Sequence, residues 1–169
     1  MSNQRIVVVT GASGNIGSHI VLKLLASGYN VRLLARGLKA EKLRNTIAKD
    51  NAHATVVEIT DIATDDFAVA FKDAYAIIHT ASPLAGQADA NSSLASALEG
   101  SLNVLRQAVK YKVKKFVMTA TWASTLERNE EVINSTHDPF WVYCATKLLS
   151  EKASWKFAAE HPELDVASS

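Results

Sequence analysis

Two residues on one predicted helix could move a proton. Tyr143 and Lys147 are four positions apart, so on a helix both side chains lie on the same face. A tyrosine hydroxyl ordinarily titrates near pH 10 and donates a proton poorly at neutral pH, unless nearby positive charge stabilises its ionised form. A lysine ammonium one turn away supplies that charge. The alternative is an ordinary amphipathic helix, because such pairs arise often by chance.

A glycine-rich turn near the start of the chain could bind phosphate groups. Gly11, Gly14 and Gly17 are spaced three apart, between an apolar run and a segment with helical spacing. Glycines let the backbone approach a pyrophosphate, and the N–H groups and dipole of a helix start attract an anion. An ordinary strand-to-helix turn is the alternative, but three glycines in the first βαβ unit favour nucleotide binding.

The elements that must position these residues alternate along the whole chain. Short apolar, β-branched runs are followed by segments with helical spacing, which predicts a parallel sheet with helices on both faces. The expected strands are 5–10, 31–35, 54–59, 74–80, 115–120 and a sixth from 164. The expected helices are 16–27, 38–49, 65–72, 91–111 and 140–160. In the first of them, Ile16, Ile20, Leu24 and Leu25 share one face. The fold class is therefore α/β. The family resemblance described below implies that this is a doubly wound Rossmann sheet of five to six strands in the order 3-2-1-4-5(-6).

Composition and charge disfavour several other classes. The 169 residues include 18 basic and 17 acidic side chains, a net charge of +1 that attracts neither nucleic acid nor anionic lipid. A hydrophobic content of 48% disfavours disorder. The single cysteine, Cys144, cannot form an internal disulfide, and the histidines are too scattered to join it in a metal site. No apolar run approaches the roughly 20 residues that span a bilayer. We expect a soluble, cytoplasmic protein without metal, nucleic acid or membrane.

Both motifs resemble those of one enzyme family. The segment Thr10-Gly-Ala-Ser-Gly-Asn-Ile-Gly17 resembles the phosphate turn of the extended short-chain dehydrogenase/reductases, and Tyr143-Cys-Ala-Thr-Lys147 resembles their catalytic motif. The resemblance implies that Tyr143 exchanges a proton with the substrate oxygen, while Lys147 also holds the nicotinamide ribose. It further implies that Thr121, at the end of the family's Thr-Ser-Ser run, binds the same oxygen. Thr119 and Ser124 are the alternatives to Thr121.

The end of the second predicted strand bears on the choice of dinucleotide. Arg36 follows Gly17 by 19 residues, where this fold often places an acidic residue that bonds the adenosine ribose. A guanidinium there can bond a 2′-phosphate, with Arg32, Lys39 and Lys42 adding charge. A surface arginine without this role is the alternative. The sequence favours NADP(H), with NAD(H) possible.

Other cofactor contacts follow from the resemblance. Asp61-Ile62 looks like the family's adenine-binding element, although Asp61 could equally cap the helix expected near Asp65. The segment His79-Thr-Ala-Ser-Pro83 is similar to the one beneath the ribose and pyrophosphate, with His79 as a packed residue rather than a catalyst. Asn103 is expected to organise structure and Cys144 to pack. The implied contact set is Gly11, Ser13, Gly14, Asn15, Ile16, Gly17, Arg36, Lys42, Asp61, Ile62, Thr80, Ala81, Tyr143 and Lys147.

The residues around the Tyr–Lys pair resemble one subgroup of the family. Asp138-Pro-Phe-Trp-Val-Tyr143 and Trp155-Lys-Phe157 are similar to segments of NADPH-dependent aldehyde and ketone reductases related to dihydroflavonol and cinnamoyl-CoA reductases. The resemblance implies reduction of a small carbonyl compound to an alcohol. A non-catalytic NAD(P)-binding module or sensor is the first alternative. A sugar-nucleotide epimerase or dehydratase is the second, and Arg36 departs from that pattern.

The resemblance covers essentially all 169 residues, but only the N-terminal half of a typical member. We therefore expect one NAD(P)-binding domain over 1–169 that ends within the sixth strand, with the C-terminal substrate region absent. Family members often dimerise through the two long helices, here 91–111 and 140–160. A monomer and a homodimer both remain open, because the same apolar faces could simply cover the sheet.

Overall fold

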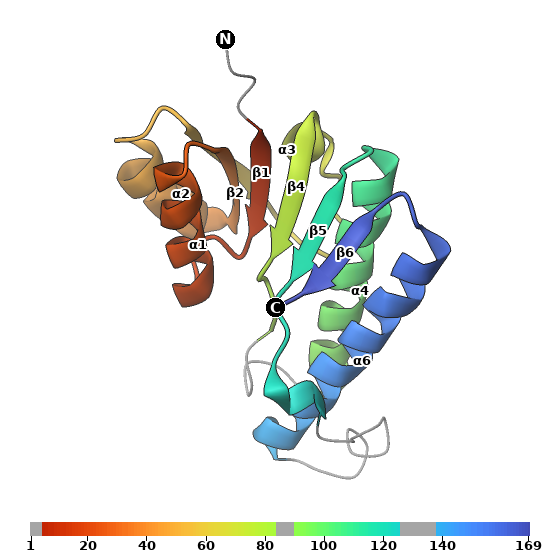
Figure 1. The fold of residues 1–169 in the computed structure, drawn as a ribbon. Helices are drawn as coiled ribbons and strands as arrows, with labels where there is room; N and C mark the ends of the chain where they lie inside the picture. The colour runs from red at the N-terminus through yellow and green to blue at the C-terminus, as the bar shows by residue number, and fades with distance from the viewer. Residues whose placement is uncertain (1–4, 84–89, 126–137) are drawn as a thin grey trace.

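A parallel sheet runs through the centre of the computed structural model, which describes residues 5–83, 90–125 and 138–169. Over these residues its six strands have the order β3-β2-β1-β4-β5-β6, and every neighbouring pair is parallel (Figure 1). They are β1 (Ile6–Thr10), β2 (Asn30–Arg36), β3 (Ala54–Ile59), β4 (Ala74–His79), β5 (Lys115–Met118) and β6 (Asp165–Ser168). The predicted Rossmann order is confirmed, with the sixth strand at the edge.

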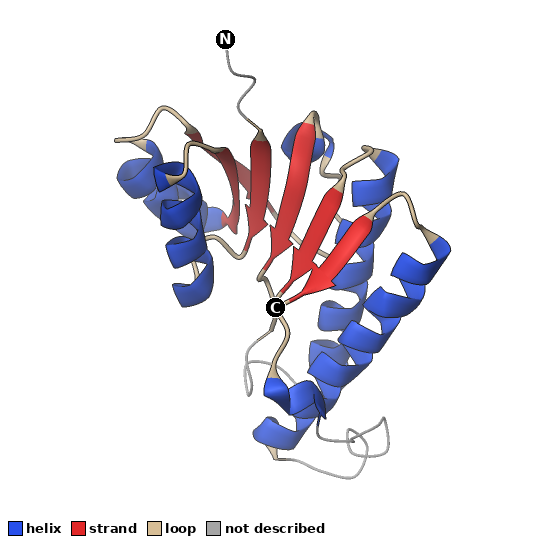
Figure 2. Cartoon of the chain, viewed as in Figure 1, coloured by secondary structure: helices blue, strands red, loops and turns tan. Residues whose placement is uncertain are grey.

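Helices cover both faces of the sheet, as the alternating pattern predicts (Figure 2). One face carries α1 (Asn15–Ala26) and α2 (Gly37–Leu43), and α2 continues as a π-helical turn, η1 (Arg44–Ala48). The other face carries α3 (Ala68–Phe71), α4 (Ala90–Lys110) and α6 (Pro139–Glu160). A short 3₁₀ helix, η2 (Trp122–Thr125), follows β5. In the described parts of the chain, no helix is both long enough and apolar enough to cross a membrane.

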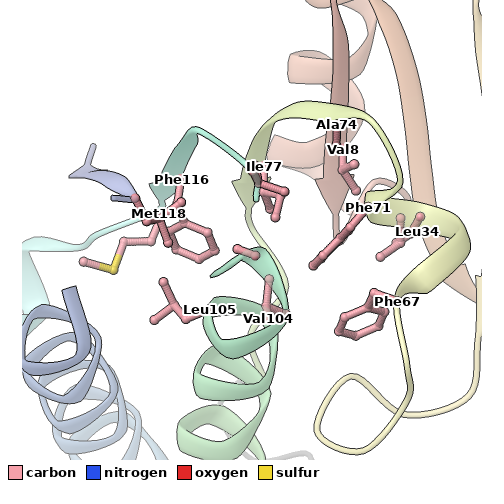
Figure 3. Close-up of a cluster of buried hydrophobic side chains, with 14 of the residues drawn as sticks. Val8, Leu34, Phe67, Phe71, Ala74, Ile77, Val104, Leu105, Phe116 and Met118 are labelled. Carbon is pink, nitrogen blue, oxygen red and sulfur yellow. The ribbon is translucent and has the colours of Figure 1, made fainter. Parts of the chain in front are cut away.

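Two hydrophobic clusters hold these layers together. Successive side chains of a strand point to opposite faces, so Val8 packs with one cluster and Val9 with the other. Figure 3 shows the cluster beneath α3 and α4, where Phe71 and Leu105 lie against the sheet. Burial on both faces explains why the strands are apolar runs without polar alternation.

The helix after β3 is shorter than predicted. We expect 65–72 from the sequence, but α3 begins at Ala68. The three residues before it are held in a loop by side chains. The Asp65 carboxylate accepts hydrogen bonds from Thr60, and the Phe67 N–H donates to Gln107 on α4 at 2.5 Å. Both bonds compete with helix formation, and periodicity reveals neither of them, because one comes from a neighbouring side chain and the other from a residue 40 positions away.

Candidate functional site

The segments that carry the predicted site residues meet at one edge of the sheet. The glycine turn follows β1, residues 80–83 follow β4, and residues 119–121 follow β5. The arrowheads of these strands point to the same edge in Figure 1. Ligands of doubly wound folds bind outside the carboxyl ends of the strands, so this edge is the candidate site.

The glycine turn is packed too closely for side chains. Gly11 has φ +67°, and a Cβ there would lie 2.7 Å from Thr80 Oγ1 and 2.8 Å from the Ala81 nitrogen. A Cβ on Gly17 would lie 2.9 Å from the Gly11 carbonyl carbon and 3.0 Å from Thr80 Oγ1. Real Cβ atoms do not approach other atoms this closely, so the turn requires glycine at both positions.

The N-terminus of α1 is available to an anion. Its N-cap is Gly14, which has no side chain to bond the first N–H groups, and its first turn contains no acidic residue. Ser13 and Asn15 are exposed beside it. Ile16 is 60% exposed. Ile20, Leu24 and Leu25, with which Ile16 was predicted to share a helix face, pack against the core, whereas the Ile16 side chain faces solvent next to the turn.

Thr80 and Ala81 hold the turn against β1. The Thr80 hydroxyl donates to the Thr10 carbonyl oxygen at 2.7 Å, and the Ala81 N–H donates to Thr10 Oγ1 at 3.3 Å. These bonds place Thr80 Oγ1 in the space that the missing side chains of Gly11 and Gly17 leave. The Thr80 side chain thus positions the glycine turn.

Arg36 and Arg32 have different environments, although both belong to β2. Arg36 is exposed at the carboxyl end of the strand, followed by Gly37 with φ +45°. The guanidinium of Arg32 instead donates to the carbonyl oxygens of Ala70, at 2.8 Å, and Lys72, at 2.5 Å. The prediction that Arg32 adds charge at a phosphate is therefore wrong, because its Nη1 bonds the end of α3. Lys39 and Lys42 are exposed on α2.

Asp61 lies in the loop after β3 and caps no helix. Its Oδ1 accepts a bond from the Ala63 N–H at 2.9 Å, whereas the Ala68 N–H at the start of α3 donates to Asp66. The alternative in which Asp61 caps that helix is therefore wrong. Asp61 is exposed and Ile62 half-buried, at the same end of the sheet as Arg36.

Helix α4 holds the loop after β3 in place through side-chain hydrogen bonds. Asn103 donates to the carbonyl oxygens of Ile62, at 3.0 Å, and Asp65, at 3.1 Å. Gln107 donates to the same Asp65 carbonyl and to Asn103 Oδ1. A Cβ on Gly100 would lie 3.0 Å from Ile62, so that glycine lets the loop rest on the helix. The sequence indicated Asn103 but missed Gln107, whose signal is its spacing of four from Asn103 on one helix face.

The start of α6 carries the Tyr–Lys pair. Pro139 occupies the first turn, and the Asp138 side chain accepts a bond from the Phe140 N–H at 2.9 Å, so the helix begins as its capping residues dictate. Tyr143 and Lys147 follow, both half-buried. Lys147 Nζ donates to the Thr119 carbonyl oxygen at 3.0 Å. Burial lowers the pKa of Lys147.

The three candidate hydroxyls near this pair, Thr119, Thr121 and Ser124, all lie in the segment that follows β5. Thr119 Oγ1 donates to the His79 carbonyl oxygen at 3.3 Å, and Ser124 Oγ donates to the Thr121 carbonyl oxygen at 2.8 Å. Thr121 precedes η2, which packs against α6 through rings of Trp122 and Phe140 whose centroids are 6.3 Å apart.

The comparison with family models decides the affiliation of the chain. Residues 7–169 match the model described as "NAD dependent epimerase/dehydratase family". The chain belongs to this family. The resemblance inferred from the glycine turn and the Tyr–Lys pair is thereby confirmed at the level of the family.

Individual family members align along nearly the whole chain. Dihydroflavonol 4-reductase of Dianthus caryophyllus is 28% identical, over 92% of this chain and 48% of its own length. Aldehyde reductase 2 of Sporidiobolus salmonicolor is 32% identical, over 92% of this chain and 53% of its own length. The crystal structure of yeast methylglyoxal/isovaleraldehyde reductase Gre2 with NADPH has a TM-score of 0.82 and 30% identity, over 96% of this chain and 56% of that one. The chain spans about half the length of these proteins.

A buried chain of hydrogen bonds lies below the site in this family member. Thr10 Oγ1 is 2.8 Å from His79 Nδ1, and His79 Nε2 is 3.2 Å from Ser101 Oγ on α4. Ser101 Oγ is 3.0 Å from Ser150 Oγ on α6, which donates to the Ala97 carbonyl oxygen at 3.3 Å. Because Thr10 Oγ1 already accepts from Ala81, its proton can go to Nδ1, and each later group can donate onward. This order requires a neutral His79.

Protonation of His79 should destabilise the domain. Burial, and secondarily the charge of Lys147, lower the pKa of His79 from 6.5 to about 4. Between these values the unfolded imidazole binds a proton and the folded one does not, so the free energy of unfolding should fall as the pH drops from 6.5 to 4. The expected loss is on the order of 3 kcal/mol, measured by urea unfolding.

The control for this loss is the His79→Asn variant. It lacks the titrating group, so its stability should be lower at pH 7 but less dependent on pH between 6.5 and 4.5. This comparison cancels the carboxylates, which titrate in both proteins. An equal pH dependence in the two proteins would show that His79 is not the group responsible.

The last of the candidate residues, Cys144, has a packing role. Cys144 is buried in α6. In the described segments, no three His, Cys, Asp or Glu side chains are grouped so that they could hold a metal ion.

Proposed function

We propose that this chain is the NADP(H)-binding domain of a reductase that converts an aldehyde or ketone to an alcohol. The supporting observation is that an uncapped helix N-terminus behind a glycine turn and the Tyr143–Lys147 pair lie at the same edge of one sheet. The names of the relatives, an aldehyde reductase and a dihydroflavonol reductase among them, agree with this class. In this proposal residues 1–169 form one domain, and the substrate is a small carbonyl compound.

The residues of the site suit a dinucleotide. The pyrophosphate would lie on the N-terminus of α1, where Gly11, Gly14 and Gly17 leave no Cβ in its way. Ser13, Asn15, Ile16 and Ala81 would surround it. Asp61 and Ile62 would contact the adenine, and Arg36 with Lys42 would bond the 2′-phosphate. Tyr143 and Lys147 would hold the nicotinamide ribose.

The proposed source of the proton for the substrate oxygen follows from the position of Tyr143 on α6. The nicotinamide of bound NADPH supplies a hydride for the carbonyl carbon. Tyr143 donates its hydroxyl proton to the carbonyl oxygen, and the Thr121 hydroxyl binds the same oxygen. Lys147, held by the Thr119 carbonyl, keeps its positive charge one turn from Tyr143 and stabilises the phenolate that remains.

Arg36 should set the cofactor preference. In the Arg36→Asp variant, NADPH affinity should fall at least about a hundredfold, because two charge-assisted hydrogen bonds are replaced by repulsion between carboxylate and phosphate. NADH affinity should stay the same or rise, since a carboxylate can bond the ribose hydroxyls. Calorimetric titration of the chain with each dinucleotide measures both effects.

The Lys49→Asp variant is the matched control for charge. Lys49 is exposed beyond η1 and undergoes the same change of two charge units. If it weakens NADPH binding as much as Arg36→Asp, long-range charge explains the effect. Equal binding of NADH and NADPH by the wild-type chain would contradict the NADP(H) assignment.

The main alternative is a module that binds a dinucleotide without turning over a substrate. It predicts tight NADPH binding and no oxidation of NADPH with a panel of aldehydes and ketones, even for the full-length protein.

Light scattering separates a monomer from a homodimer through α4 and α6. In the single chain these two helices already pack against each other, through Ser101 and Ser150 among others.

A further inference from the structure

A small polar pocket lies beside Lys147, on the side toward the interior. Its lining includes His79, Ser101, Thr119, Lys147, Ser150 and Glu151, contributed by β4, α4, the end of β5 and α6. The proposed function gives a role to Lys147 in this set and none to Glu151. Glu151 is one helical turn beyond Lys147, as Lys147 is one turn beyond Tyr143.

Most of the polar side chains around the pocket are hydrogen-bonded to one another or to the backbone. His79, Ser101 and Ser150 bond to one another, and Ser154 donates to the Ser150 carbonyl oxygen at 2.8 Å. Glu151 Oε2 is buried and has no hydrogen-bond partner among the described residues. A buried carboxylate oxygen without a partner costs considerable free energy, so its presence calls for a bonding group in the pocket.

Lys147 has donors available for that group. Its ammonium carries three N–H donors, and one of them bonds the Thr119 carbonyl. In the part of the chain that the structure describes, no ion pair within 4.0 Å joins Lys147 to a carboxylate. An ammonium and a carboxylate that line one polar pocket without touching are typical partners of a bridging water.

We propose that Glu151 is a positioning residue for Lys147, whose ammonium it holds through water bound in this pocket. The carboxylate thereby orients Lys147 between Thr119 and the pocket and fixes its charge on the side of α6 that carries Tyr143. The effect on proton transfer rests on the proposed function, whereas the coupling between Glu151 and Lys147 does not.

The charges around Lys147 assign this task to Glu151. His79, from β4, has its pKa lowered to about 4 by burial and is neutral at pH 7. Tyr143 lies on α6 itself, and neither α4 nor the end of β5 contributes a charged group to the pocket. Burial lowers the pKa of Lys147, and the charge of Glu151 opposes this. Glu151 thus helps to keep the lysine protonated.

The coupling can be measured without cofactor or substrate. Lysine labelled with ¹³C at Cε reports the protonation of each ammonium by NMR, and the Lys147→Met spectrum assigns the resonance. In Glu151→Gln, which keeps the shape of the side chain and removes its charge, the titration midpoint of Lys147 should move to lower pH. In Glu160→Gln, an exposed position on the same helix, it should not move.

An unchanged midpoint in a folded Glu151→Gln protein would overturn the proposal. A crystal structure of the wild-type chain should contain a water within hydrogen-bond distance of both Glu151 and Lys147, and a direct ion pair would contradict the bridge. Thermal unfolding confirms that the variants are folded. If Glu151→Gln does not fold, Glu151→Asp serves instead, and its shorter side chain should broaden the Lys147 resonance without a loss of charge.

The functional consequence is tested separately on NADPH binding. In the Glu151→Gln chain, NADPH affinity should begin to fall at a lower pH than in the wild-type chain, because Lys147 loses its proton at a lower pH. A shifted NMR midpoint without any NADPH binding would support the positioning role and contradict the proposed function. NADPH binding that is equally insensitive to pH in the wild-type and Glu151→Gln chains would refute the link between the protonation of Lys147 and NADPH binding.

Discussion

The Tyr143→Phe variant should bind NADPH within about threefold of wild type and reduce carbonyl substrates roughly a thousandfold more slowly. Phenylalanine keeps the ring on α6 but has no proton to donate, and loss of a general acid typically costs a factor of about 10² to 10⁴. The full-length protein is the appropriate sample, since the chain covers about half of its relatives. Steady-state oxidation of NADPH with an aldehyde panel, followed at 340 nm, measures the rate.

Tyr75→Phe is the control for this experiment. Tyr75 is half-buried near the amino end of β4, whereas the candidate site lies at the carboxyl end, and its ring packs under the Arg5 guanidinium. Its loss of a hydroxyl should leave the rate unchanged. A Tyr143→Phe protein with more than a tenth of the wild-type rate would exclude Tyr143 as the proton donor and direct attention to Thr121.

The Gly17→Ala variant should lose at least a hundredfold in NADPH affinity. The new Cβ would lie 2.9 Å from the Gly11 carbonyl carbon and 3.0 Å from Thr80 Oγ1, so the Gly11 peptide must move. That peptide forms the turn against which the phosphates would rest, and each charge-assisted bond lost there costs roughly 1.5 to 3 kcal/mol. Alanine favours helix formation over glycine, so helix propensity cannot account for the loss. Calorimetry with NADPH gives the affinity.

Gly28→Ala separates this effect from general destabilisation. Gly28 follows the other end of α1 and has φ +82°, so alanine strains the backbone, but a Cβ there meets no atom within 4 Å. This variant should be less stable by about 1 kcal/mol and bind NADPH normally. Equal losses of affinity in the two variants would contradict a specific role for the glycine turn.

The strands of the sheet and the glycine turn were predictable because they depend on local patterns. Apolar runs such as Ile6–Thr10 and Ala54–Ile59 appear in the sequence as continuous β-branched stretches, and short crossovers leave few topologies. The Tyr–Lys pair was predictable from spacing within one helix. Each of these features is set by residues close together in the sequence.

Features that depend on distant partners were not predictable. Arg32 was expected near a phosphate, but its guanidinium bonds the carbonyl oxygens of Ala70 and Lys72, which are far away along the chain. The late start of α3 depends on Gln107, 40 residues beyond Phe67. The exposure of Ile16 likewise depends on how α1 sits on the sheet, which helical periodicity does not specify.

Helix α4 sets the spacing between the two ends of the proposed dinucleotide site. Through Gly100, Asn103 and Gln107 it supports the loop of Asp61 and Ile62, where the adenine would lie. Through Ser101 it bonds α6, the helix that carries Tyr143 and Lys147. These contacts come from neighbouring turns of one rigid element. Helix α4 therefore sets the distance between the adenine end and the nicotinamide end of the proposed site, although α4 itself need not contact either group.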